Sequence, residues 1–103
     1  MARIVLQPKT PGDASNVTFD FISRLAAGET LSSASVACTV YSGTDANPSA
    51  MVSGAASVSG TKILQKIIAG TAGNVYQLVC TATTSAGMTL VLTAYLAVES
   101  NLP

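Results

Sequence analysis

Few residues in the chain could carry out chemistry. It contains no histidine, which excludes serine–histidine triads, cysteine–histidine pairs and histidine metal ligands. Ser59 and Lys62 have the S-x-x-K spacing of serine–lysine acyl enzymes, but those enzymes hold the lysine in a buried position beside the nucleophile. Here Gly60 places a turn between the two residues. We therefore expect no catalytic residue, no cofactor and no metal site.

The remaining candidate groups are carboxylates and thiols. Five acidic residues lie far apart, mostly beside turns, where solvated surface charge is the expected role: Asp13, Asp20, Glu29, Asp45 and Glu99. Cys38 and Cys80 both fall on inward phases of strand patterns, so they could form a disulfide or be two small apolar core residues. Residues 1–17 contain no apolar stretch of signal-peptide length, and a reducing cytoplasm favours free thiols.

Composition excludes several classes of partner. Five basic residues balance five acidic ones and only 10% of residues are charged, so no basic patch for nucleic acid is expected. The longest apolar tract, Leu90–Val98, is too short to span a membrane, which takes about 20 residues. Low net charge also means little repulsion between copies. We expect a protein made in the cytoplasm that binds copies of itself and other proteins, with no small-molecule substrate.

The chain is predicted to fold into short strands separated by turns, because hydroxyl and β-branched residues dominate its sequence. Ser23–Glu29 is expected to be a crossover containing one helical turn at residues 25–27, and residues 42–48 a loop. About seven strands are predicted, with the sixth centred on Tyr76–Cys80: Arg3–Gln7, Asn16–Ile22, Leu31–Tyr41, Ala50–Val58, Thr61–Ala69, Tyr76–Cys80 and Met88–Glu99.

Alternation assigns inward faces to four of these strands. The residues predicted to face the core are Val17, Phe19 and Phe21, then Ala34, Val36, Cys38 and Val40, then Tyr76, Leu78, Cys80 and Ala82, and finally Met88, Leu90, Leu92, Leu96 and Val98. In Thr61–Ala69 neither face is clearly polar, so its register is not assigned.

A partner interface is predicted on the last strand and the two ends of the chain. The other face of the last strand, with Val91, Thr93 and Tyr95, is only half polar. Extended terminal segments, residues 1–15 and 100–103, flank the domain and contain proline, which suits binding to a neighbour better than packing in a sheet. The predicted interface is Arg3, Val5, Lys9, Val91, Thr93, Tyr95 and Leu102.

From Phe19 onward the chain resembles a family of short immunoglobulin-like virion proteins of tailed bacteriophages. The likeness covers about four-fifths of the sequence. It rests on Phe19-Asp20-Phe21, the Leu25-Ala26-Ala27-Gly28-Glu29-Thr30 crossover, the Gly70-Thr71-Ala72-Gly73 turn before Tyr76, and Thr83-Thr84-Ser85-Ala86-Gly87. The resemblance implies one immunoglobulin-like antiparallel β-sandwich over residues 1–103.

The same resemblance implies a role. Proteins of this kind are non-enzymatic fibre–tail adaptors or decoration proteins of the virion, made in the host cytoplasm, and the partner could be capsid, neck, tail or fibre. The alternative is a surface module that binds a receptor or carbohydrate. Sugar-binding faces usually present aromatic platforms, whereas this chain has no tryptophan and three tyrosines: Tyr41, Tyr76 and Tyr95.

Overall fold

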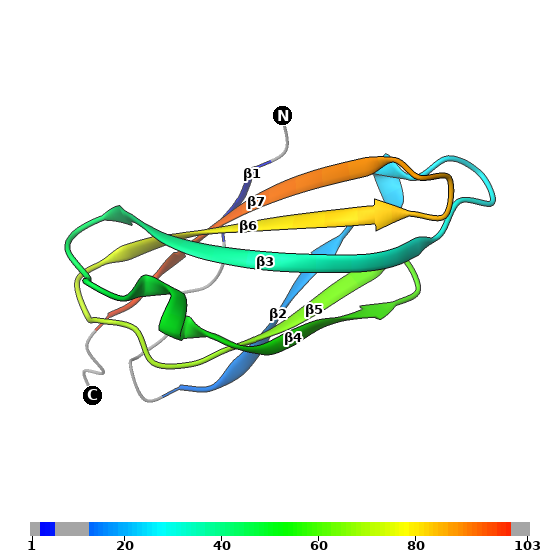
Figure 1. The fold of residues 1–103 in the computed structure, drawn as a ribbon. Coiled ribbons are helices and arrows are strands. Elements are labelled where there is room, and N and C mark those ends of the chain that lie inside the picture. Colours follow the sequence, from blue (N-terminus) through cyan, green and yellow to red (C-terminus); the bar gives the residue numbers. More distant parts are fainter. Residues whose placement is uncertain (1–2, 6–12, 100–103) are drawn as a thin grey trace.

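The chain forms two β-sheets packed face to face (Figure 1). The computed structural model describes residues 3–5 and 13–99. One sheet has the order β1-β7-β6-β3 and the other β2-β5-β4. The strands are β1 (Arg3–Val5), β2 (Ser15–Asp20), β3 (Leu31–Ser42), β4 (Val52–Ser59), β5 (Lys62–Ile67), β6 (Val75–Thr84) and β7 (Thr89–Ala97).

This strand order is that of an immunoglobulin-like sandwich. β2, β5 and β4 take the places of strands B, E and D, while β7, β6 and β3 take those of G, F and C. The predicted all-β sandwich is confirmed, and both three-stranded units are antiparallel. β1 differs because it runs parallel to β7. A parallel pair needs a long connection, and here the rest of the domain supplies it.

Two short 3₁₀ turns carry the chain between the sheets: η1 (Ile22–Arg24) and η2 (Pro48–Met51). The expected helical turn at residues 25–27 was therefore placed too late. The Asp20 carboxylate accepts a hydrogen bond from the Ile22 N–H at 3.0 Å, and this local bond turns the chain directly after β2. The fourth strand likewise begins at Val52 instead of Ala50, because Pro48 opens a 3₁₀ turn.

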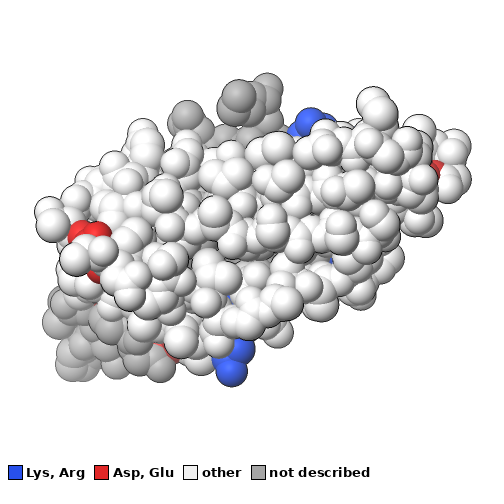
Figure 2. Space-filling model, viewed as in Figure 1, with Lys and Arg blue, Asp and Glu red and all other residues white. Residues whose placement is uncertain are grey.

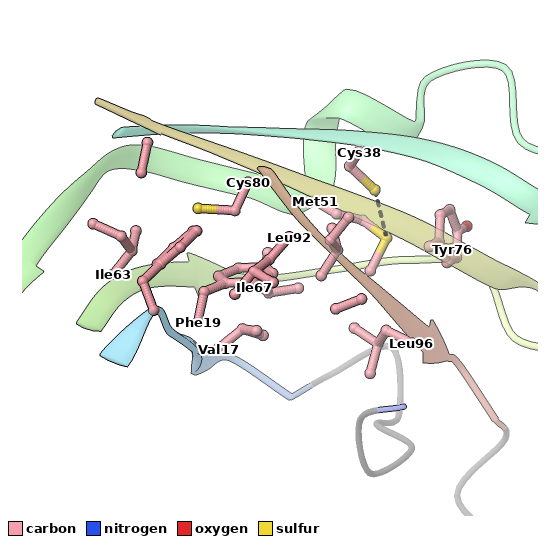
Figure 3. Packing of buried hydrophobic residues seen from close by; sticks show 14 of the residues in the cluster. Val17, Phe19, Cys38, Met51, Ile63, Ile67, Tyr76, Cys80, Leu92 and Leu96 are labelled. Atoms are coloured by element: carbon pink, nitrogen blue, oxygen red, sulfur yellow. Dashed lines mark hydrogen bonds between the residues drawn. The ribbon is translucent and has the colours of Figure 1, made fainter. Parts of the chain in front are cut away.

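The core lies between the sheets, and β6 is its central strand. Buried and half-buried residues alternate without a break along β6, and Phe19 on β2 and Phe21 directly after β2 are fully buried in the same core. The inward faces predicted for β2, β3 and β6 are confirmed; in β3, Cys38 is buried, whereas Ala34, Val36 and Val40 are half-buried. Met51 fills the core beside Cys38, whose Sγ lies 3.9 Å from the Met51 Sδ (Figure 3).

The structure of β5 explains why the register of this strand could not be assigned from the sequence. Its inward residues are Ile63, Gln65 and Ile67, so the buried phase includes a polar amide. The Gln65 Nε2 lies 3.1 Å from the carbonyl oxygens of Ser53 and Gly54. These carbonyls lie where the β4–β5 register shifts. The amide therefore satisfies backbone groups that the irregular ladder leaves without strand partners.

One predicted core residue is outside the core. Met88 is 60% exposed because it belongs to the loop between β6 and β7, not to β7. The loop is closed by the Thr84 N–H, which donates to the Met88 carbonyl at 2.9 Å, and by the Gly87 N–H, which donates to the Thr84 carbonyl at 3.0 Å. The inward face of β7 therefore starts with the half-buried Leu90, and Leu92, Leu96 and Val98 are buried as predicted.

Candidate interaction surface

The outward face of β3, β6 and β7 is a continuous surface without charge. The strand registers place its residues in four rows. Serine, threonine and small apolar side chains dominate these rows, and no described residue in them is charged. We call this surface the outer face: Ser33, Thr83 and Thr89; Ser35, Thr81 and Val91; Ala37, Val79 and Thr93; Thr39, Gln77 and Tyr95.

The opposite surface of the sandwich is different. On the sheet of β2, β5 and β4, the outward side chains include Asp20, Lys62 and Lys66, with Asp20 and Lys62 paired across the strands. Figure 2 shows the side of the molecule along β3, where the surface is mostly white and coloured atoms lie toward the periphery. The rows themselves thus carry no charge, and two cations lie at the β7 margin of the outer face: Arg24 donates to the Val91 carbonyl, and the backbone of Arg3 pairs with Thr93.

The predicted interface residues on β7 do lie together. Val91 is 45% exposed, and Thr93 and Tyr95 are half-buried on the same side of the strand. In β1 the backbone of Arg3 is paired with Thr93, and that of Val5 with Tyr95. The N-terminal segment and the last strand of the prediction therefore meet at one sheet edge. Lys9 and Leu102, the other two predicted residues, lie outside the described residues.

Sequence reasoning missed the part of the outer face that β3 and β6 supply. Only the last strand was singled out, because strand order across a sheet cannot be read from alternation. A signal was nevertheless present, since residues 67–98 contain no charged residue and residues 30–61 contain only Asp45. Two hairpin strands whose outward phase lacks charge indicate a covered or partner-facing surface.

Two tyrosines form an aromatic pair at one end of the outer face. The rings of Tyr41 and Tyr95 meet edge to face, with centroids 4.8 Å apart and an interplanar angle of 64°. Tyr41 is 60% exposed, and the Gln77 Nε2 donates to the Tyr95 hydroxyl at 3.3 Å. This is the most exposed aromatic surface in the described part of the chain, and aromatic rings with a polar edge are common anchors at interfaces.

A buried hydroxyl organises the loops next to this pair. Tyr76 is fully buried at the start of β6, and its hydroxyl donates to the Asp45 carboxylate at 2.6 Å. It accepts from the Thr71 N–H at 2.9 Å and from the Asn74 Nδ2 at 3.2 Å. The hydrogen bond from Tyr76 and a second one from the Asn47 N–H hold the pKa of Asp45 below its usual value. The arrangement is the tyrosine corner of immunoglobulin-like domains.

A second network ties the loops at the other end. The Thr84 hydroxyl donates to the Glu29 carboxylate at 2.6 Å, and the Ala26 N–H donates to the other carboxylate oxygen at 2.9 Å. These two bonds lower the pKa of Glu29. The Thr30 N–H also donates to the Ser85 hydroxyl at 3.0 Å. The loops at both ends of the outer face are thus held by side-chain hydrogen bonds.

The groups considered for chemistry are separated or confined. Ser59 and Lys62 are exposed and face each other across the tight β4–β5 turn. Cys38 and Cys80 are buried free thiols on neighbouring strands. Within residues 3–5 and 13–99, no cluster of acidic residues and cysteines could hold a metal ion. In that same part of the chain, no helix has the length and apolar character needed to cross a membrane.

Comparison with known proteins gives one family match. A family model described as podophage GP4 fiber-tail adaptor protein gp77 matches residues 9–97. A search of curated proteins gave no match. The matched range contains β2 to β7, and so it includes all twelve positions of the outer face.

Proposed function

Because the chain belongs to the podophage fibre–tail adaptor family, we propose that it is a non-enzymatic virion protein that joins fibre to tail through its outer face. The family match makes it a structural protein of a tailed phage and confirms the resemblance drawn from the sequence. What we propose beyond the family is that the outer face is the binding surface. It is carried by one observation, the absence of charge from the rows of β3, β6 and β7.

The physical reason is the cost of desolvation. Small apolar side chains, and hydroxyl groups that find a hydrogen-bond partner in the interface, lose less than an unpaired charge does when a partner displaces water. The outward surface of β2 and β5 carries Asp20, Lys62 and Lys66 and suits contact with solvent. We propose that other virion proteins cover the outer face, with assembly in the host cytoplasm, and that nucleic acid and membrane are not partners.

A matched pair of substitutions tests the surface. Thr93→Lys places a charge on the outer face, and Thr18→Lys places the same charge on the exposed outward side of β2. We expect Thr93→Lys to reduce incorporation of the chain into phage particles at least tenfold, and Thr18→Lys to leave it unchanged. Incorporation is measured by quantitative immunoblot of purified particles that receive the chain only from a plasmid, with circular dichroism confirming that both variants fold. Normal incorporation of Thr93→Lys would refute the assignment.

The aromatic pair supports one alternative, a surface module that binds carbohydrate. Tyr41 and Tyr95 offer an exposed ring surface next to hydroxyl and amide groups, the combination that sugar sites use. Tyr41→Ala removes the ring with the least effect on the core, because Tyr41 is exposed. Binding of wild-type protein to host-surface polysaccharide, lost in Tyr41→Ala, would favour this function, whereas particles that incorporate Tyr41→Ala normally and adsorb normally would favour the adaptor.

A further inference from the structure

The two sheets have four edges, and three of them are blocked. β1 pairs with residues 93–95 of β7, and the Arg24 guanidinium donates to the Val91 carbonyl farther along the same edge at 3.3 Å. β4 is irregular, with a register shift between Ser53 and Ser57. β2 is six residues long and ends in the charged Asp20. Short, irregular or charged edges are the usual means of preventing strand addition.

The fourth edge, β3, is neither short nor charged, and its ladder is regular over its middle. It is the longest strand at 12 residues and contains no charged residue, proline or glycine. Its pairing with β6 is regular from Ser33 to Val40, with register shifts only at the two ends. β4 passes near β3 in the opposite layer, yet its ladder is with β5. Within the described residues, no strand pairs with the free side of β3.

β3 is also complementary to itself. In an antiparallel pair of identical strands related by a two-fold axis perpendicular to the sheet, odd-numbered residues meet odd-numbered ones and even-numbered residues meet even-numbered ones. On the outward side this brings together Ser33, Ser35, Ala37 and Thr39, which are small and uncharged, and at the ends of the pair the uncharged Tyr41. On the inward side it brings together Ala34, Val36 and Val40, which are half-buried and pack at the margin of the core.

We propose that β3 pairs with β3 of a second copy of this chain, antiparallel and about a two-fold axis. A second copy is the occupant that the charges favour, because the edge carries none and the chain has a net charge of zero. Self-pairing therefore opposes no like charges. The pairing covers the half-buried apolar side chains at the core margin and satisfies the free backbone groups of β3. It joins two four-stranded sheets into one of eight strands.

This arrangement goes beyond the adaptor role. The two-fold axis keeps both outer faces on the same side of the joined sheet, so the dimer presents a doubled uncharged surface to a partner. The edge contact and the outer-face contact use different atoms, namely the backbone of β3 and the side chains of the rows. Failure of one proposal therefore leaves the other open to its own test.

The test compares a charge at the edge with the same charge inside the sheet. Ala37 and Val79 lie opposite each other in one row of the outer face, but only Ala37 is on the edge strand. Sedimentation velocity of the full chain over a range of concentrations should give a dimer with twice the 10.4 kDa mass of one chain. Ala37→Lys should raise the dimer dissociation constant more than about tenfold, because the two lysines lie near the axis. Val79→Lys should leave the constant within about threefold of wild type.

A mixture provides the decisive result. Equal amounts of Ala37→Lys and Ala37→Glu chains should form a mixed dimer that neither forms alone, since opposite charges then meet at the axis. Circular dichroism of each variant checks that the sandwich is intact. The proposal is overturned if the wild-type chain is a monomer at millimolar concentration, if Val79→Lys weakens the dimer as much as Ala37→Lys, or if the mixture stays monomeric.

Discussion

The buried hydroxyl of Tyr76 offers a stringent test of how the loops are held. Tyr76→Phe keeps the ring in the core but removes the acceptor for the Thr71 N–H and the Asn74 amide, at 2.9 and 3.2 Å. A net contribution of about 1 kcal/mol per hydrogen bond gives a loss of about 2 kcal/mol for these two bonds, to which the lost donation to the Asp45 carboxylate adds. For a domain of this size, that loss lowers the melting temperature by about 8–16 °C.

The same substitution has a pH signature. The Tyr76 hydroxyl is the main reason that the pKa of Asp45 lies below its ordinary value of 3.8. A carboxylate with a lowered pKa in the folded state stabilises the fold above its unfolded pKa, and this stabilisation is lost as pH falls through the folded pKa. The difference between wild type and Tyr76→Phe should therefore be larger at pH 7 than at pH 3.

The assay is urea denaturation followed by far-ultraviolet circular dichroism at both pH values. Tyr41→Phe is the matched control, because it removes a hydroxyl from a residue that is 60% exposed, and a change within about 0.5 kcal/mol is expected there. A Tyr76→Phe protein as stable as the wild type, or a stability difference that does not shrink in acid, would show that the hydroxyl does not hold the corner.

Two further outcomes are expected. Burial raises the pKa of Cys38 and Cys80 to about 11 from the ordinary 9.0. The stability that the protonated thiols contribute is therefore complete below pH 9 and is lost as pH rises from about 9 to 11, and urea titrations over that range measure the loss. A stability change on adding reductant at pH 7 would contradict the assignment of free thiols. Deleting residues 1–11 removes the three-residue β1 and should leave a folded core with little change in melting temperature while abolishing incorporation into particles; a truncated chain that unfolds would place the first strand in the core.

Where the chain has local alternation, the sequence predicted the structure well. Phe19, Phe21 and the even-numbered residues of β6 face the core as expected. The register of β5 could not be assigned from the sequence, because its inward phase includes Gln65, whose amide binds the carbonyls of the irregular β4, and no local pattern reveals that contact. Met88 failed because a hydrogen-bonded loop extends one residue farther than the apolar pattern suggests.

The candidate surface was predicted only in part, for a similar reason. Val91, Thr93 and Tyr95 follow from alternation within one strand. Their neighbours on β3 and β6, and the placement of Arg3 and Val5 beside them, depend on which strands are adjacent. Adjacency is a property of the whole fold, and it became predictable only through the family resemblance, which implies the order of strands in an immunoglobulin-like domain.

The parallel pairing of β1 and β7 has a mechanical consequence. Arg3 begins β1 and Ala97 ends β7, and the two strands run in the same direction, so tension applied between these two points pulls the strands past each other lengthwise. The hydrogen bonds between residues 3–5 and 93–95 would then be loaded together in shear instead of opening one at a time. In the proposed adaptor role, a pull applied at these two points would have to break this short clamp first.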